Sequence, residues 1–136
     1  MTAKEYLSQA KTLRLMIANK QKLLAELKEK AIASGSLDLK PDKVQTSIDG
    51  SRMEYAVAEY ADLEREINAD IRRYFEKRNE IIDMIHSLED SRYIMVLHAK
   101  WIDGESLERI AADMHYYFGT VRKWYWKAMK EIEKKI

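Results

Sequence analysis

Residues 2–31 read TAKEYLSQAKTLRLMIANKQKLLAELKEKA, and this stretch decides the fold. Its apolar side chains recur at alternating intervals of three and four residues, the heptad pattern of helices that pack side by side. The members of this seam are Tyr6, Ala10, Leu13, Ile17, Leu24, Leu27 and Ala31. Lys20 places a charge at one seam position. Thr2 and Glu5 have the spacing of a capping box, so we predict a helix that begins there and continues unbroken.

A second seam of the same kind follows farther along the chain. Its members are Ala56, Tyr60, Leu63, Ile67, Ile71, Tyr74, Ile81, Ile85 and Leu88, with a drift near Asp70 and Arg78. Between the two seams, residues 34–52 are rich in Gly, Ser and Asp and include Pro41, which is typical of a linker. Two long helices joined by one linker most simply pack as an antiparallel, coiled-coil-like hairpin.

The composition limits the class of protein. A chain of 136 residues with 4 Gly and 1 Pro is expected to be all-α. It contains no cysteine, which excludes disulfides, thiolate metal sites and cysteine nucleophiles. No apolar run approaches the roughly 18–20 residues that span a bilayer. We therefore expect a cytoplasmic protein without membrane contact.

The last third of the chain predicts three shorter helices. Their expected ranges are 91–102, 107–114 and 118–136. Asp90 and Ser106 are suited to cap the first two, and Asp103-Gly104 between them is a strong stop signal. We predict two domains, a helical hairpin and a C-terminal module. Their limits are 1–88, with the linker at about 34–52, and 89–136.

The last two of these helices have the spacing of a DNA-binding helix-turn-helix. A short helix, a turn of three or four residues and a longer basic helix form the arrangement that places a recognition helix in the major groove. Ala111 supplies the small side chain that a close helix crossing requires, and Val121 would fill the space beside it. Residues 118–136 carry six Lys or Arg against two acidic residues, whereas the whole chain has a net charge of +1. A local field of this kind attracts a polyanion.

The run WIDGESLERIAADM, residues 101–114, resembles region 4 of sigma-70 factors, in which an aromatic-Ile-x-Gly-x-Ser stretch precedes an Ile-Ala pair. Thr120-Val121-Arg122 matches the Thr-Val-basic step of that region, and Ala128-Met129 matches its Ala-Leu pair. The whole chain resembles small phage regulators that join a helical N-terminal region to such an end, the late-operon activators of the RinA and ArpU type. Further landmarks of that group are matched by Asp42 to Ser47, Asp62 to Glu64 and Leu88 to Asp90.

This resemblance implies a DNA-binding transcription regulator of phage or prophage origin that acts at promoters. Double-stranded DNA is the implied partner, RNA polymerase is a further candidate, and the long helices could form a homodimer. If the last helix docks as in that family, its exposed face, together with the cap of the preceding helix, carries the DNA contacts. The implied residues are Ser106, Phe118, Gly119, Thr120, Arg122, Lys123, Trp126, Lys127 and Lys130.

The chemistry of these side chains suggests what each would contact. Arg122 and Lys123 suit guanine edges or phosphates, and Thr120 suits a phosphate or a thymine methyl group. Lys127 and Lys130 suit backbone phosphates. Tyr117 stands where the family has a small polar cap residue. Either the helix therefore begins later, with Thr120 as its cap, or Gly119 lets the backbone approach a phosphate closely.

Two other functions stay open from the sequence. One is a phage DNA-packaging or assembly protein of the small-terminase kind, and the other is a protein-interaction adaptor that binds polymerase without touching DNA. We predict no enzymatic activity and no cofactor. We also predict no metal site, because His86, His98 and His115 share no metal-ligand spacing.

Overall fold

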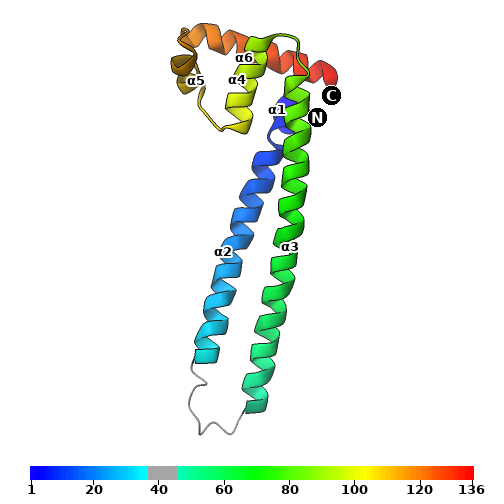
Figure 1. The fold of residues 1–136 in the computed structure, drawn as a ribbon, viewed down its shortest axis with the longest axis vertical. Helices are drawn as coiled ribbons and strands as arrows, with labels where there is room; N and C mark the ends of the chain where they lie inside the picture. Colours follow the sequence, from blue (N-terminus) through cyan, green and yellow to red (C-terminus); the bar gives the residue numbers. More distant parts are fainter. Residues whose placement is uncertain (37–45) are drawn as a thin grey trace. The chain divides into compact units, whose positions relative to one another are not determined.

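A computed structural model describes the backbone of residues 1–36 and 46–136 and the side chains of residues 1–32 and 53–136. Within these ranges every regular element is a helix (Figure 1). The elements are α1 (Ala3–Leu7), α2 (Gln9–Ser36), α3 (Thr46–His86), α4 (Ser91–Leu97), the π-helix η2 (His98–Ile102), α5 (Leu107–Met114) and α6 (Phe118–Lys135). Helices α2 and α3 pack antiparallel, which confirms the predicted all-α fold with a long helical hairpin.

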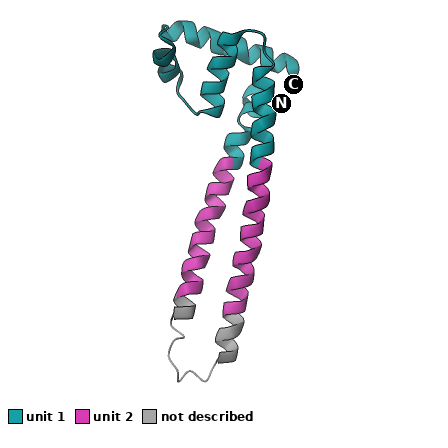
Figure 2. Ribbon diagram, viewed as in Figure 1, with its two compact units in different colours: residues 1–13, 74–136 teal, residues 14–73 magenta. Residues whose placement is uncertain are grey.

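Contacts divide the chain into two compact units (Figure 2). Unit 1 comprises residues 1–13 and 74–136, and unit 2 comprises residues 14–73. The first residues of the chain and the last turns of α3 thus belong with the C-terminal helices. The predicted domain limits of 1–88 and 89–136 followed the hydrophobic pattern alone, and they stay a prediction.

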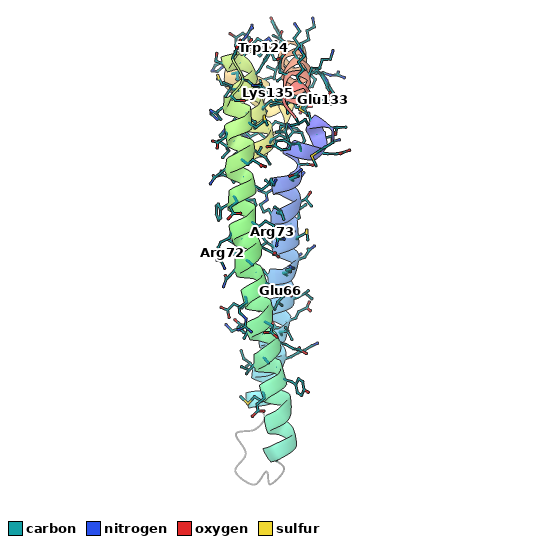
Figure 3. All side chains as sticks on the ribbon, turned by 90° about the vertical axis from the view of Figure 1, so that its right-hand side faces the viewer. Glu66, Arg72, Arg73, Trp124, Glu133 and Lys135 are labelled. Carbon is teal, nitrogen blue, oxygen red and sulfur yellow. The ribbon has the colours of Figure 1, made fainter. Side chains whose placement is uncertain are left out.

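Unit 2 is a two-helix layer held by a narrow apolar seam. Among the side chains of this unit that the structure describes, the buried apolar ones are Ile17 of α2 and Ile67 of α3. The other predicted seam positions of this unit are half-buried. They are Leu24, Leu27, Ala31, Ala56, Tyr60, Leu63 and Ile71. The heptad pattern therefore identified the buried face of both helices, while polar side chains such as Glu66, Arg72 and Arg73 project from α3 (Figure 3).

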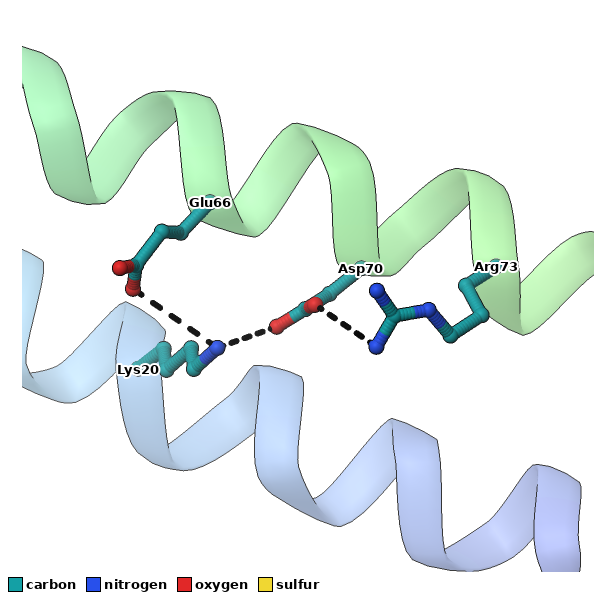
Figure 4. A network of polar contacts seen from close by, with 4 residues as sticks. All are labelled: Lys20, Glu66, Asp70 and Arg73. Atoms are coloured by element: carbon teal, nitrogen blue, oxygen red, sulfur yellow. Dashed lines mark hydrogen bonds and ion pairs between the residues drawn. The ribbon is translucent and has the colours of Figure 1, made fainter.

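The charged residues that interrupt the two seams meet each other. Lys20 Nζ lies 2.6 Å from Asp70 Oδ2 and 3.8 Å from Glu66 Oε2, and Arg73 lies 3.7 Å from the other Asp70 oxygen (Figure 4). Asp70 is only 8% exposed. The hydrogen bond that Lys20 donates to Asp70 raises the pKa of the Lys20 ammonium group. Because the pair can form at one alignment of the helices only, it favours that register.

Unit 1 is built around a larger apolar cluster to which α1, α3, α4, α5 and α6 all contribute. Its fully buried side chains of greatest volume are Leu7, Ile81, Ile85, Leu97, Ile110, Ile132, Val96 and Val121. Helix α1 packs against α6, and the N–H of Ala3 donates to Glu133 of α6 at 3.5 Å. The N-terminal turn is thereby part of the C-terminal module.

Two details of the helices differ from the sequence prediction. The first helix is interrupted at Ser8, whose hydroxyl donates to the Glu5 carbonyl at 3.1 Å and competes with the helical pattern. The capping box of Thr2 and Glu5 is confirmed. The predicted α-helix over residues 91–102 changes to the π-helix η2 at His98.

Helices extend into the predicted linker, residues 34–52, from both of its ends. Helix α2 continues to Ser36 and α3 begins at Thr46, because isolated Gly and Ser residues lower helix stability by about 1 kcal/mol or less and do not forbid a helix. The central residues 37–45 lie outside the described part of the chain. No helix among the described residues is long and apolar enough to cross a lipid bilayer.

Candidate nucleic-acid interface

Helix α5 has the limits and the cap that the sequence predicted. The Ser106 hydroxyl accepts a hydrogen bond from the N–H of Arg109 at 3.2 Å and so satisfies one free donor of the first turn. The helix ends at His115, which adopts a left-handed conformation with φ 60° and ψ 39°. The next N–H, of Tyr116, donates back to the Ala111 carbonyl at 3.1 Å. This closure turns the chain sharply within residues 115–117.

Helices α5 and α6 contact each other through the residues that the spacing had selected. Ile110 and Ala111 of α5 are buried, and so are Val121 and Tyr125 of α6. The neighbouring Trp124 is only half-buried. Burial raises the pKa of the Tyr125 hydroxyl.

Helix α6 begins at Phe118, as its predicted range did, so the alternative of a later start with Thr120 as the cap is wrong. Tyr117 is extended at the N-cap position and makes no side-chain capping bond, while its carbonyl accepts from the N–H groups of Thr120 and Val121, both at 3.1 Å. Gly119 lies in the first helical turn, and a Cβ atom there would meet nothing within 4 Å. The first turn of α6 is therefore open in front of Gly119, and helix N-termini of this kind favour anions.

The predicted contact residues of α6 share one face of the helix. Gly119, the pairs Arg122-Lys123 and Trp126-Lys127, and Lys130 recur every three to four residues along the helix, which is the spacing of a single helix face. All six are exposed, with Trp126 at 54%. Of the remaining predicted residues, Phe118 is exposed at 40%, Thr120 is half-buried, and the Ser106 hydroxyl on α5 is engaged as a cap.

The basic groups on this face carry uncompensated charge. Among the described residues, no acidic side chain lies within 4.0 Å of the charged nitrogens of Arg122, Lys123, Lys127 or Lys130. Lys134, in the last turn, differs because it lies 3.3 Å from Glu131. Four neighbouring cations without such partners produce the kind of local positive field that attracts phosphate groups.

Aromatic side chains beside this face were not selected from the sequence. Tyr117 is 87% exposed, and Tyr116 packs edge-to-face on Trp124 with ring centroids 4.8 Å apart. The Arg92 guanidinium stacks over the same Trp124 ring at 5.3 Å. The available signal was the run of three aromatic residues, 116–118, which covers the end of the expected turn and the first residue of the next helix, because polar residues are the rule in a turn.

Comparisons with protein families, with characterised proteins and with solved structures found no match for this chain. The resemblance to sigma-70 region 4 therefore rests on the residues quoted above.

Proposed function

We propose that this protein binds double-stranded DNA through the exposed face of α6 and acts as a transcription regulator. The observation that carries the proposal is the row of four cations on one face of α6, Arg122, Lys123, Lys127 and Lys130, without ion-pair partners in the described part of the chain. The helix follows a shorter helix and a three-residue turn, which is the spacing of helix-turn-helix readers of the major groove.

The proposed contacts follow from where each side chain lies on α6. Arg122 and Lys123 lie closest to the N-terminal end of the basic row, the end that meets base edges when a recognition helix enters the groove. Lys127 and Lys130, one and two turns later, would bind phosphates. Phe118 offers an apolar surface to a thymine methyl group, and the open first turn at Gly119 suits a phosphate.

The proposal is tested by selecting binding sites from random duplex DNA and measuring affinity for the selected site by fluorescence anisotropy. The double variant Arg122→Ala, Lys123→Ala should bind about tenfold or more weakly, since base-edge contacts contribute about 1–3 kcal/mol each. The matched control is Lys28→Ala, Lys30→Ala, which removes two exposed cations of unit 2. The control should bind as the wild type does.

Salt dependence provides a second measurement on the same proteins. The logarithm of the binding constant falls with the logarithm of salt concentration, with a slope of about −0.9 for each phosphate contact. Lys127→Ala should make the slope shallower by about 0.9, the amount that corresponds to one phosphate contact. No selected site and no shift of any duplex at low salt would overturn the proposal.

The other two functions have their own signatures. A large ring in light scattering would favour a packaging protein, and polymerase binding that survives the loss of Arg122 and Lys123 would favour an adaptor. Action at phage promoters, contact with RNA polymerase and homodimerisation through the long helices rest on the family resemblance. They stay part of the proposal.

A further inference from the structure

Unit 1 contains a pocket with a volume of about 310 Å³ between the end of α3, α4, η2 and α5. Its walls are mostly apolar and include Ile94, Ala99, Ile110 and Met114, with the exposed Met95 at its edge. A volume of this size lies at the lower end of the range for small-molecule sites, roughly 300–1,000 Å³. The pocket can therefore hold a compact ligand of one ring or a short chain.

The π-helix η2 forms one wall of this pocket. Its first residues, His98 and Ala99, line the pocket, and its end is closed by hydrogen bonds from Asp103 to the His98 carbonyl at 3.1 Å and from Glu105 to the Ala99 carbonyl at 3.0 Å. A π-turn is rarer and less favourable than an α-turn, and such turns are frequent at functional sites. Here the wide turn brings two carboxylates to the rim.

The polar groups at the rim are mostly acidic. Asp103, Glu105 and Asp113 line the pocket together with His86 and His98. Asp113 lies 3.5 Å from Arg109, but no Lys or Arg among the described residues lies within 4.0 Å of the carboxylates of Asp103 or Glu105. The nearest basic group to Asp103 is the His98 ring at 3.9 Å, and His98 is also hydrogen-bonded to His86 at 3.0 Å.

We propose that this pocket binds a small organic cation with an apolar body. The aromatic or aliphatic body would lie against the wall that Ile110 and Met114 form on α5, where a thioether favours contact with a ring. The ammonium group would lie against Asp103 and Glu105 and form charge-assisted hydrogen bonds there. The inference does not depend on the proposed DNA binding, because it concerns the free protein and residues outside the basic face of α6.

The test uses two probes of similar shape and opposite charge, 2-phenylethylammonium and 3-phenylpropanoate. Binding is followed by NMR on protein labelled with ¹³C at the methionine methyl groups. The ammonium probe should cause saturable shifts of Met95 and Met114. Met16 and Met53, exposed in unit 2, should not respond and serve as the internal control. The carboxylate probe should bind at least about fivefold more weakly, because it faces like charges at the rim.

Variants test separately how the charge of the rim and the shape of the pocket contribute to binding of the probes. Asp103→Asn with Glu105→Gln should abolish the fivefold preference while the neutral probe 2-phenylethanol binds as before. Glu89→Gln with Glu108→Gln removes two exposed acids that do not line the pocket and should change nothing. Ala99→Leu should fill the pocket and abolish binding of all three probes.

Two results would overturn the inference. One is equal binding of the ammonium and carboxylate probes, and the other is a shift of Met16 and Met53 in parallel with Met95 and Met114, which shows non-specific association. Absence of saturable shifts in the wild type also contradicts it, since the methionine spectrum without probe shows that the protein is folded.

Discussion

Unit 1 and unit 2 are both made of helices, yet they bury their side chains in different ways. Unit 1 gathers side chains from α1, the start of α2, α3, α4, α5 and α6 into one apolar cluster. Unit 2 consists of parts of α2 and α3, and among its described residues it buries Ile17, Ile67 and the acidic Asp70. Two helices in contact share one seam, whereas several helices at several crossings enclose a volume. The same hydrophobic periodicity thus produces a three-dimensional core in one unit and a strip in the other.

The difference changes what fixes each unit in its native arrangement. In unit 1, side chains of different shapes interlock, so a shifted helix would leave cavities. A uniform apolar seam would let one helix slide along the other by one heptad. A polar pair at a single position of the seam opposes that shift. Unit 2 also leaves large apolar side chains such as Leu15, Leu23 and Val57 exposed. Homodimerisation through the long helices would cover part of that surface.

The largest effect is expected from removing aliphatic bulk in the core of unit 1. Ile132→Ala should lower the free energy of unfolding by about 2–5 kcal/mol, because Ile132 is fully buried in the cluster. Ile17→Ala should lower the free energy of unfolding by less than Ile132→Ala does. Water reaches the seam of unit 2, and neighbouring side chains can relax into the space that the smaller residue leaves. Urea unfolding measures both. Tryptophan fluorescence reports on unit 1 alone, because Trp101, Trp124 and Trp126 all lie there, and circular dichroism reports on both units. Equal losses at the two sites would contradict the comparison.

The next effect concerns the polar pair in the seam of unit 2. Asp70→Leu alone should lower the melting temperature measured by circular dichroism, because the half-buried Lys20 ammonium group loses its partner at 2.6 Å and keeps only Glu66 at 3.8 Å. The double variant Lys20→Leu, Asp70→Leu should regain the wild-type value or exceed it, since apolar residues restore a continuous seam. Lys28→Leu, at an exposed position of α2, is the control. A double variant as unstable as the single one would show that the pair itself stabilises the hairpin.

A smaller, pH-dependent effect is expected at the cap of α4 in unit 1. The hydrogen bonds and charge of Arg92 lower the pKa of Asp90 below its ordinary value. The ionised carboxylate therefore stabilises unit 1 above about pH 3.9, and this contribution is lost as the pH falls through the lowered pKa. Asp90→Asn keeps a capping oxygen and removes the charge. The wild type should be more stable than Asp90→Asn near neutral pH, and this difference in stability should shrink in acid. Urea midpoints followed by tryptophan fluorescence measure it. A stability difference that does not change with pH would contradict a stabilising role of the Asp90 charge.

The smallest effect is expected at the start of α6. Gly119→Ala should stabilise unit 1 by about 0.5–1 kcal/mol, because the position is helical and the new methyl group meets no neighbour. If a phosphate approaches the backbone here, the same variant should bind DNA more weakly although it is more stable. Unchanged DNA affinity would remove the first turn of α6 from the proposed interface.

Much of the fold could be predicted because the forces that set it are local. The caps at Thr2, Asp90 and Ser106 are satisfied by donors two or three residues away, so their spacing alone identifies them. The limits of α5 follow from such a cap and from the turn at His115, whereas α6 begins at Phe118 without a side-chain cap from Tyr117. The exposed face of α6 follows from helical periodicity, since its members stand opposite Val121, Tyr125 and Ala128.

Other features depend on contacts between residues that are far apart in the sequence, so no local pattern predicts them. The seams showed that Lys20 and Asp70 interrupt the pattern, but only the packing of α2 on α3 brings the two together. The π-turn at His98 lies beside a pocket whose lining residues come from the end of α3, from α4 and from α5, which are separate segments of the chain.

The sequence by itself determined the helices, their buried faces and the basic face of α6, because periodicity, capping and charge act within a few residues. Tertiary structure alone decided that residues 1–13 join α6 in one core, that Lys20 pairs with Asp70, and that the pocket has an acidic rim. The physical reason is the sequence distance involved. The chemistry of a side chain and its place in the pattern indicate whether it will be buried. Which distant residue covers it depends on how all the apolar surfaces of the chain can be buried at the same time.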